Sequence, residues 1–351
     1  MPSSSARRRT RCAFTRFFGG PHTFDPHRRI APKAIRLTIS SPSFTAPAEA
    51  AGFEMTSMRI EFKLFAVHNR FPNERDEASP ATSAGMSNRT IERARRWVED
   101  AQRVVVLTGA GISTDSGIPD FRGPQGVWTR DPVAEKLSTL QHYLADRDVR
   151  KAAWHSRLTH PAWHAKPNAG HLALVALEHR GKLHALITQN IDELHQVAGN
   201  SRERVIEVHG TVRKVTCWSC GWTGPMQPVL ERVRAGEQDP ACERCGGILK
   251  SATISFGQPL EPDVIERAMQ AAQEASVFLA VGTSLQVFPI AGALPAARAA
   301  GARIIIVNAE PTAMDELAHA LLPGAISALL PRILAPQPTA DLMASNEDAD
   351  A

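Results

Sequence analysis

Short apolar runs alternate with longer amphipathic segments through most of this chain. The apolar runs occupy residues 104–107, 183–188, 205–208, 252–256, 277–281 and 304–307. Each run has the length of a strand and is rich in Val, Ile or Leu, which is typical of strands buried on both faces of a parallel sheet. The pattern predicts an α/β fold with a doubly wound, Rossmann-like parallel sheet.

Helical spacing of apolar residues fills the intervals between these runs. Ile91, Ala94 and Val98 predict a helix that leads into the first strand, and residues 321–334 predict a closing helix. Residues 130–165 predict further helices without a chemical motif. We expect these helices to form an insertion beside the sheet.

The predicted elements divide the chain into four parts. Residues 86–212 and 250–335 form the Rossmann-like domain, and residues 213–249 form a small module between its two halves. Residues 1–85 and 336–351 lack a sustained hydrophobic period, which predicts disordered extensions.

Charge and composition narrow the function classes. Residues 1–85 hold 13 Lys and Arg against 7 Asp and Glu, whereas the remainder holds 27 against 29. The basic character therefore belongs to the N-terminal extension, which argues against direct binding of nucleic acid by the folded part. No apolar run approaches the 18 or so residues of a membrane span, so we expect no membrane partner.

Four of the five cysteines form two pairs with metal-ligand spacing. Cys217 and Cys220 make one C-x-x-C pair, and Cys242 and Cys245 make the other. Two such pairs can surround Zn²⁺ with four thiolates, which leaves no open position for water. The pattern predicts one structural zinc ion per chain and thiols kept in a reducing compartment, so we expect a cytoplasmic protein.

A glycine turn follows the first apolar run. Gly109-Ala110-Gly111 comes directly after residues 104–107 and leads into the polar stretch that begins at Ser113. A strand, a glycine turn and a helix start together can hold a phosphate group with backbone N–H groups. The spacing of a dinucleotide-dehydrogenase fingerprint is absent, and so is its ribose-binding acid.

Polar residues also follow the next two strands. Gln189, Asn190 and Asp192 come after residues 183–188, and His209 comes after residues 205–208. Ligands bind at the carboxyl ends of strands in such sheets. These residues alone do not separate a ligand site from a structural role. A polar loop that caps the next helix, or a histidine held by structural hydrogen bonds, would show the same pattern.

Taken together, these motifs resemble the sirtuins, the NAD-consuming protein deacylases. The segments GAGISTDSGIPDFRG, TQNID, VHG and GTS occur here in the family's order. The resemblance covers about residues 91–334. It implies a Rossmann-like domain with a zinc module and a helical insertion over the ligand-binding edge.

The resemblance implies a role for each matched position. His209 corresponds to the catalytic general base, and Phe121 and Arg122 to a lid that shields the reacting ribose. The implied NAD-binding residues are Gly109, Ala110, Gly111, Ile112, Ser113, Asp120, Phe121, Arg122, Gln189, Asn190, Ile191, Asp192, Gly282, Thr283, Ser284, Asn308, Glu310 and Ile326.

The implied activity is transfer of an acyl group from an acyl-lysine protein to the ADP-ribose part of NAD, with release of nicotinamide. The alternatives are protein mono-ADP-ribosyl transfer at the same NAD site, a dehydrogenase and a non-enzymatic zinc-ribbon module. The family usually has Phe-Gly-Glu where this chain has Phe256-Gly257-Gln258. That difference leaves the preferred acyl group open.

Overall fold

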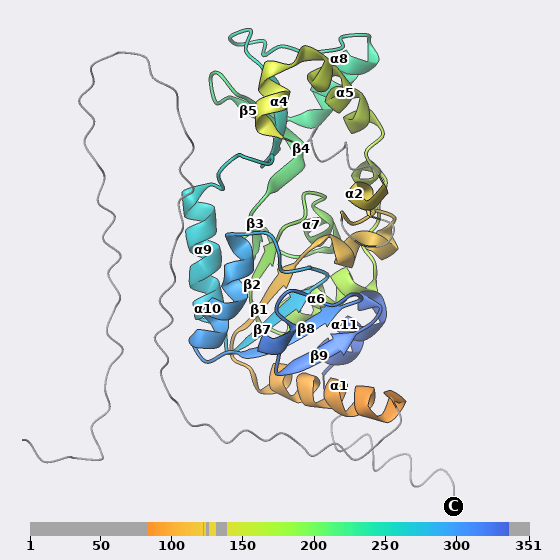
Figure 1. Cartoon of the computed structure of the whole chain (residues 1–351), viewed down its shortest axis with the longest axis vertical. Coiled ribbons are helices and arrows are strands. Elements are labelled where there is room, and N and C mark those ends of the chain that lie inside the picture. The colour runs from red at the N-terminus through yellow and green to blue at the C-terminus, as the bar shows by residue number, and fades with distance from the viewer. Residues whose placement is uncertain (1–82, 122, 124–125, 131–138, 337–351) are drawn as a thin grey trace, which may run out of the picture. The chain divides into compact units, whose positions relative to one another are not determined.

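The computed structural model describes residues 83–121, 123, 126–130 and 139–336 (Figure 1). Most of the two predicted extensions and Arg122 lie outside the described residues. The first described helix, α1, begins at Ser83, just inside the predicted N-terminal extension. No helix in the described ranges is long and apolar enough to cross a membrane.

Six parallel strands form the large sheet in the order β3-β2-β1-β7-β8-β9. They are β1 (Val104–Thr108), β2 (Leu183–Thr188), β3 (Val205–Glu207), β7 (Val277–Val281), β8 (Arg303–Asn308) and β9 (Ala320–Pro323). From β1 the chain adds strands first on one side and then, from β7, on the other. The predicted doubly wound parallel sheet is confirmed, and its switch point lies between β1 and β7.

Helices cover both faces of this sheet (Figure 1). Val104 and Val106 of β1 lie in one core with the first group of helices, and Val105 and Leu107 lie in a second core on the opposite face. The first group is α1 (Ser83–Asp100), α6 (Ala169–His179) and α11 (Ile326–Leu334); the second is α9 (Pro262–Gln273) and α10 (Ala293–Ala299). Burial on both faces explains why β1 is a continuous apolar run.

A second, antiparallel sheet with strand order β5-β4-β6 carries the cysteine pairs. Its elements are β4 (Gly210–Cys217), β5 (Thr223–Pro225), β6 (Leu249–Thr253) and the helix α8 (Met226–Arg234). Trp154 is fully buried against Val215, Met226 and Leu230 of this module. The predicted helical insertion thereby packs on the zinc module.

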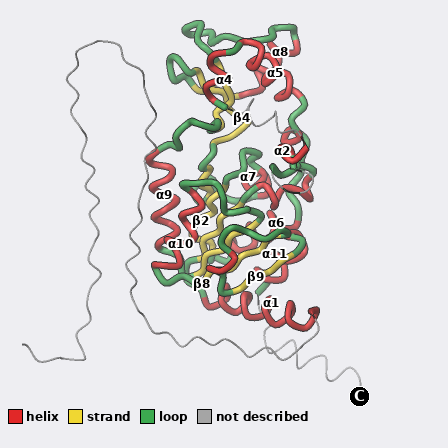
Figure 2. Tube along the Cα trace, viewed as in Figure 1, coloured by secondary structure: helices red, strands yellow, loops and turns green. Residues whose placement is uncertain are grey.

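The remaining elements are short. They are α2 (Val127–Arg130), α4 (Leu140–Ala145), α5 (Arg147–Leu158) and α7 (Leu194–Ala198), with 3₁₀ turns at Ala110–Ser116, Pro161–Trp163, Ile290–Gly292 and Asp315–Leu317. Trp154 belongs to α5. Figure 2 shows strand β4 of the small sheet near α4, α5 and α8.

Two predicted elements differ from the structure. The run expected at 252–256 in the large sheet is instead β6, which ends at Thr253 and pairs with β4 in the small sheet. The closing helix expected over 321–334 is split: residues 320–323 form β9, and α11 begins only at Ile326. Gly324, with φ +142°, separates the strand from the helix.

Candidate active site

The glycine turn after β1 lies against the end of β7, at the switch point of the sheet. Gly109 N–H donates to the carbonyl of Val281 at 3.0 Å, and Gly111 N–H donates to that of Gly282 at 2.9 Å. A Cβ on Gly109 would lie 2.6 Å from the Gly282 oxygen, and one on Gly111 would lie 2.8 Å from the Gly282 Cα. The two loops therefore approach each other so closely that only glycine fits at these two positions.

Three polar side chains from two loops meet beside this turn. The Ser113 hydroxyl donates to Asp192 Oδ2 at 2.8 Å and accepts a hydrogen bond from Asn190 Nδ2 at 3.2 Å. All three residues are buried. The first and second polar loops therefore meet through these three side chains.

The Asp192 carboxylate is held by its neighbours in a fixed orientation. Its Oδ1 accepts the backbone N–H of Leu194 at 2.9 Å, while Oδ2 accepts the Ser113 hydroxyl. Burial raises the pKa of Asp192, and these hydrogen bonds act in the opposite direction. The group is a buried hydrogen-bond acceptor beside the glycine turn.

Gln189 connects the same loop to the end of β7. Its side-chain Nε2 donates to Thr283 Oγ1 at 2.9 Å, and Thr283 Oγ1 also accepts the backbone N–H of Leu285 at 3.3 Å. Leu285 has φ 56°, which is unusual for a residue with a side chain. The two predicted nucleotide-binding loops are therefore joined by side-chain contacts.

His209 lies at the start of β4, next to Gln189. Its Nδ1 is 3.0 Å from the Gln189 carbonyl oxygen. Because a carbonyl can only accept, Nδ1 carries the proton and Nε2 of the neutral ring carries a lone pair. Burial lowers the pKa of His209, and the Gln189 carbonyl raises it in part. The ring is neutral at pH 7, with one nitrogen able to take a proton.

Several other predicted NAD-binding residues lie at the carboxyl ends of strands of the large sheet or just beyond them. Ile112 is buried in the turn beyond β1, Ser284 follows β7, and Asn308 ends β8. Asn308 Nδ2 donates to the Glu310 carbonyl at 2.6 Å. Ile326, at the start of α11, lies beside Gly282.

The lid predicted after the glycine turn is described only in part. Asp120 Oδ1 accepts the Gly123 backbone N–H at 3.0 Å, and the Phe121 side chain is 43% exposed. Arg122 lies outside the described residues. Phe121 therefore offers an apolar surface next to the glycine turn.

The four cysteines converge in the small module. Their sulfur atoms all lie within 4.8 Å of one another, with Cys217 Sγ 3.6 Å from Cys245 Sγ and Cys220 Sγ 3.9 Å from Cys242 Sγ. Four sulfurs bound to Zn²⁺ at about 2.3 Å in a tetrahedron are about 3.8 Å apart. The cluster therefore fits a tetrahedral zinc ion, as the spacing predicts.

Buried polar residues that are not among the predicted site residues lie beneath this site. Thr108 and Thr188 end β1 and β2, and His171 and His195 lie in α6 and α7. All four are buried. A hydroxyl at the last position of two adjacent apolar strands is the sequence signal that could have indicated the two threonines.

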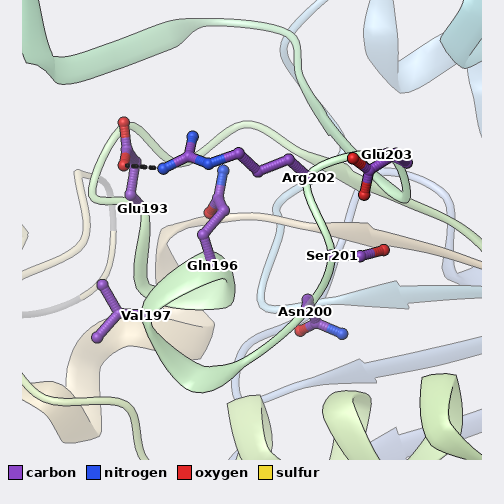
Figure 3. A pocket seen from close by; sticks show the side chains of 7 residues that line it. All are labelled: Glu193, Gln196, Val197, Asn200, Ser201, Arg202 and Glu203. Carbon is purple, nitrogen blue, oxygen red and sulfur yellow. Dashed lines mark ion pairs between the residues drawn. The ribbon is translucent and has the colours of Figure 1, made fainter.

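A hollow of about 420 Å³ lies beside α7 and is lined by side chains of residues 193–203 (Figure 3). Arg202 reaches across it to Glu193, with NH2 3.6 Å from Oε2. None of the predicted NAD-binding residues lines it. A second hollow of about 270 Å³ is lined by Val208 and Gly210, the neighbours of His209.

The parallel sheet, the glycine cradle at its switch point and the four-cysteine module define a nucleotide-binding α/β enzyme with a structural zinc site. Residues 109–289 match the model of the Sir2 family. The chain belongs to the Sir2 family.

Proteins similar to this chain are named NAD-dependent protein deacetylases. The NAD-dependent protein deacetylase 2 of Streptomyces coelicolor is 51% identical over 231 residues, which cover 66% of this chain and 96% of the relative. The NAD-dependent protein deacetylase 1 of Pyrobaculum aerophilum is 43% identical over 234 residues, covering 66% and 88%.

Solved Sir2 structures have the same fold. A Sir2 enzyme from work on the mechanism and regulation of these enzymes has a TM-score of 0.64 and 36% identity, and the match covers 70% of this chain and 97% of that one. A complex of Sir2 with a p53 peptide and NAD⁺ has a TM-score of 0.62 and 30% identity, with the same coverage.

Proposed function

We propose that His209 is the general base in the NAD-dependent protein deacetylation that this chain catalyses. Family membership and the activity named for its relatives support deacetylation over the alternative of protein mono-ADP-ribosyl transfer. The observation that carries the role of His209 is its Nδ1 contact with the Gln189 carbonyl, which leaves Nε2 free to accept a proton.

The turn of Gly109 and Gly111 beside Gly282 would lie against the phosphates of NAD, since glycines carry no side chain that would keep a ligand away from the backbone. Asn190 and Asp192 would hold the nicotinamide end, and Asn308 and Glu310 the adenosine end. When bound, NAD supplies the ADP-ribose group that receives the acyl group as nicotinamide leaves.

The protein's own residues would position NAD and supply the base. Ser113 holds the Asn190 amide and the Asp192 carboxylate in one arrangement, so that both are oriented before NAD binds. His209 would accept the proton of a ribose hydroxyl, and Phe121 would exclude water from the reacting carbon. His209 therefore needs to be neutral in the resting enzyme.

We propose that the protein substrate is an acylated lysine in an extended peptide. A Sir2 structure with 29% identity and a TM-score of 0.62 is bound to an acetylated peptide. In this chain, the exposed Phe256 follows β6, and its carbonyl accepts the backbone N–H of Leu140 at 2.9 Å. Gln258 accepts the backbone N–H of Ser255 at 3.3 Å, so it stabilises its own turn.

The zinc ion would hold the small sheet together without taking part in the chemistry, because four thiolates fill its coordination. We also propose a cytoplasmic location, since four zinc-binding thiols need a reducing compartment.

The test is nicotinamide release from NAD with a panel of acylated lysine peptides. We expect steady-state release over many turnovers to require an acyl-lysine and to fall at least about a hundredfold in His209→Ala, the size of a general-base contribution. His155→Ala, a change at an exposed histidine of α5, is the matched control and should retain full release.

Two outcomes would contradict the proposal. Release without an acyl-lysine, with ADP-ribose found on protein, would indicate ADP-ribosyl transfer. Release in His209→Ala equal to that of His155→Ala would remove His209 from the role of base.

A further inference from the structure

Two buried histidines lie beneath the candidate site, and their hydrogen bonds define their tautomers. The Thr108 hydroxyl donates its proton to Thr188 Oγ1 at 2.9 Å and lies 3.0 Å from His195 Nε2. Since that hydroxyl proton is already used, Thr108 Oγ1 accepts from His195, and Nε2 of His195 carries the proton. His195 Nδ1 is then an acceptor.

His171 has the same tautomer for a different reason. Its Nδ1 accepts the backbone N–H of Asn168 at 3.3 Å in the capping box of α6. An accepting Nδ1 means that Nε2 of the neutral ring carries the proton. Burial lowers the pKa of His171 to about 4 and that of His195 well below its usual value, so both rings are neutral.

The two rings leave complementary atoms without partners. His171 Nε2, a donor, and His195 Nδ1, an acceptor, are both buried and have no hydrogen-bond partner among the described residues. Their ring centroids are 5.0 Å apart with a 52° tilt. An unpaired donor and an unpaired acceptor in adjacent buried rings each cost desolvation energy, and a small rotation of the rings would pair them.

We propose that His171 Nε2–H donates to His195 Nδ1 and so completes a buried hydrogen-bond chain that positions the catalytic loop. The chain runs through Asn168, His171, His195, Thr108, Thr188 and Asn190.

The two ends of this hydrogen-bond chain lie at different parts of the candidate active site. At one end, the Asn168 amide donates to the Ile112 carbonyl at 2.8 Å and to Ser116 Oγ at 3.0 Å, within the glycine-turn segment. At the other end, Thr188 Oγ1 accepts the backbone N–H of Asn190 at 3.1 Å. The chain therefore connects the nucleotide cradle with the loop that carries Asn190.

Gln189 lies between the two residues that this bond joins. Fixing Thr188 to Asn190 fixes the direction of the Gln189 carbonyl, and that carbonyl sets the tautomer of His209. His195 is thus a positioning residue that acts through Thr108 and Thr188. The consequence for catalysis rests on the proposed role of His209, whereas the hydrogen bond between the two histidines does not.

The direct test is ¹⁵N NMR of the imidazole nitrogens in the full-length protein, with assignment by single-histidine variants. We expect His171 and His195 both as Nε2–H tautomers, His209 as the Nδ1–H tautomer, and an N–H···N coupling between His171 Nε2 and His195 Nδ1. An Nδ1–H tautomer at either buried histidine, or the absence of that coupling, would overturn the proposal.

Kinetics of two variants test the positioning role. His195→Phe fills the ring volume without hydrogen bonds, so we expect kcat to fall about tenfold with KM for NAD changed by less than about twofold. His195→Gln can donate to Thr108 from its terminal amide, so kcat should stay within about threefold of the wild type. His155→Phe is the control for the substitution itself.

Equal kcat values in His195→Phe and the wild type, or equal losses in the Phe and Gln variants, would overturn the positioning role. If His195→Phe does not fold, the NMR tautomers still decide the proposal. A wild-type enzyme that releases no nicotinamide would contradict the proposed function, and the NMR result would be unaffected.

Discussion

At the scale of single residues, the chemistry depends on which atom of a side chain is already occupied. His209 can act as a base because the Gln189 carbonyl occupies Nδ1 and leaves Nε2 free. Asp192 remains an oriented acceptor because Ser113 and the Leu194 N–H hold its two oxygens. Neither property belongs to the residue type alone.

The pH dependence of the reaction follows from the state of His209. Burial lowers its pKa below the ordinary value of 6.5, and a base must be neutral to accept a proton. We expect kcat/KM to be constant between about pH 7 and 8 and to fall below the lowered pKa, with a midpoint below pH 6.5. A pH–rate profile with an acid midpoint near pH 7 or above would contradict this. In His209→Ala, kcat/KM should not show this decrease at acid pH.

At the scale of elements, a buried carboxylate at the end of β3, near α7, lowers the stability of the folded state when it is charged. Glu207, the last residue of β3, has a buried Oε1 without a hydrogen-bond partner among the described residues. Burial and the nearby Glu193 raise its pKa to about 7. Glu193 is held at the same time by Thr211, whose hydroxyl donates to Oε1 at 2.7 Å, and by Arg202 (Figure 3).

Replacing this acid by its neutral isostere should stabilise the fold above about pH 4.5, with the full effect reached above about pH 7. The folded state binds a proton on Glu207 more tightly than the unfolded state does, so stability falls as pH rises from about 4.5 to 7. We expect Glu207→Gln to raise the free energy of unfolding by about 1–2 kcal/mol at pH 8, a value reduced for partial solvent screening, and to leave it unchanged near pH 4.

Denaturant unfolding of the variant at both pH values measures this difference. Glu203→Gln, at an exposed position beside the hollow that Glu193 lines, is the control and should have little effect. A stabilisation of Glu207→Gln that is the same at both pH values would show that the charge is not its cause.

At the scale of the whole folded part, two sheets with different stabilising forces meet at His209. The large sheet is buried between two layers of helices, whereas the small sheet depends on a core of few residues and on the cysteine cluster. His209 lies between the end of β3 and the start of β4, so the small sheet determines where its ring lies.

Zinc removal should therefore abolish activity while the large sheet persists. We expect a chelator to release one zinc ion per chain, with loss of amide-exchange protection in β4, β6 and α8 but not in β1 and β7. Cys220→Ser should lose zinc in the same way, and Cys12→Ser, outside the predicted zinc module, should retain it. A zinc-free protein with full kcat would contradict this dependence.

Much of this fold follows from local sequence patterns. Val104–Thr108 and Val277–Val281 are continuous apolar runs because both of their faces are buried, and that pattern needs no knowledge of partners. The cysteine spacing likewise predicts the cluster, since each pair forms one tight turn. The residues 252–256 were assigned to the wrong sheet, because an apolar run does not reveal which strand it pairs with.

What the sequence by itself determined is the class of fold, the four cysteines of the cluster and the loops that follow the strands of the large sheet. Periodicity and spacing are local properties, and they survive without tertiary contacts. Only the tertiary structure decided that Ser113 joins Asn190 to Asp192, and that Thr108 and Thr188 lie beside His195. These contacts join segments about 80 residues apart in the chain, so hydrogen-bond direction and burial become known only when the strands are packed side by side.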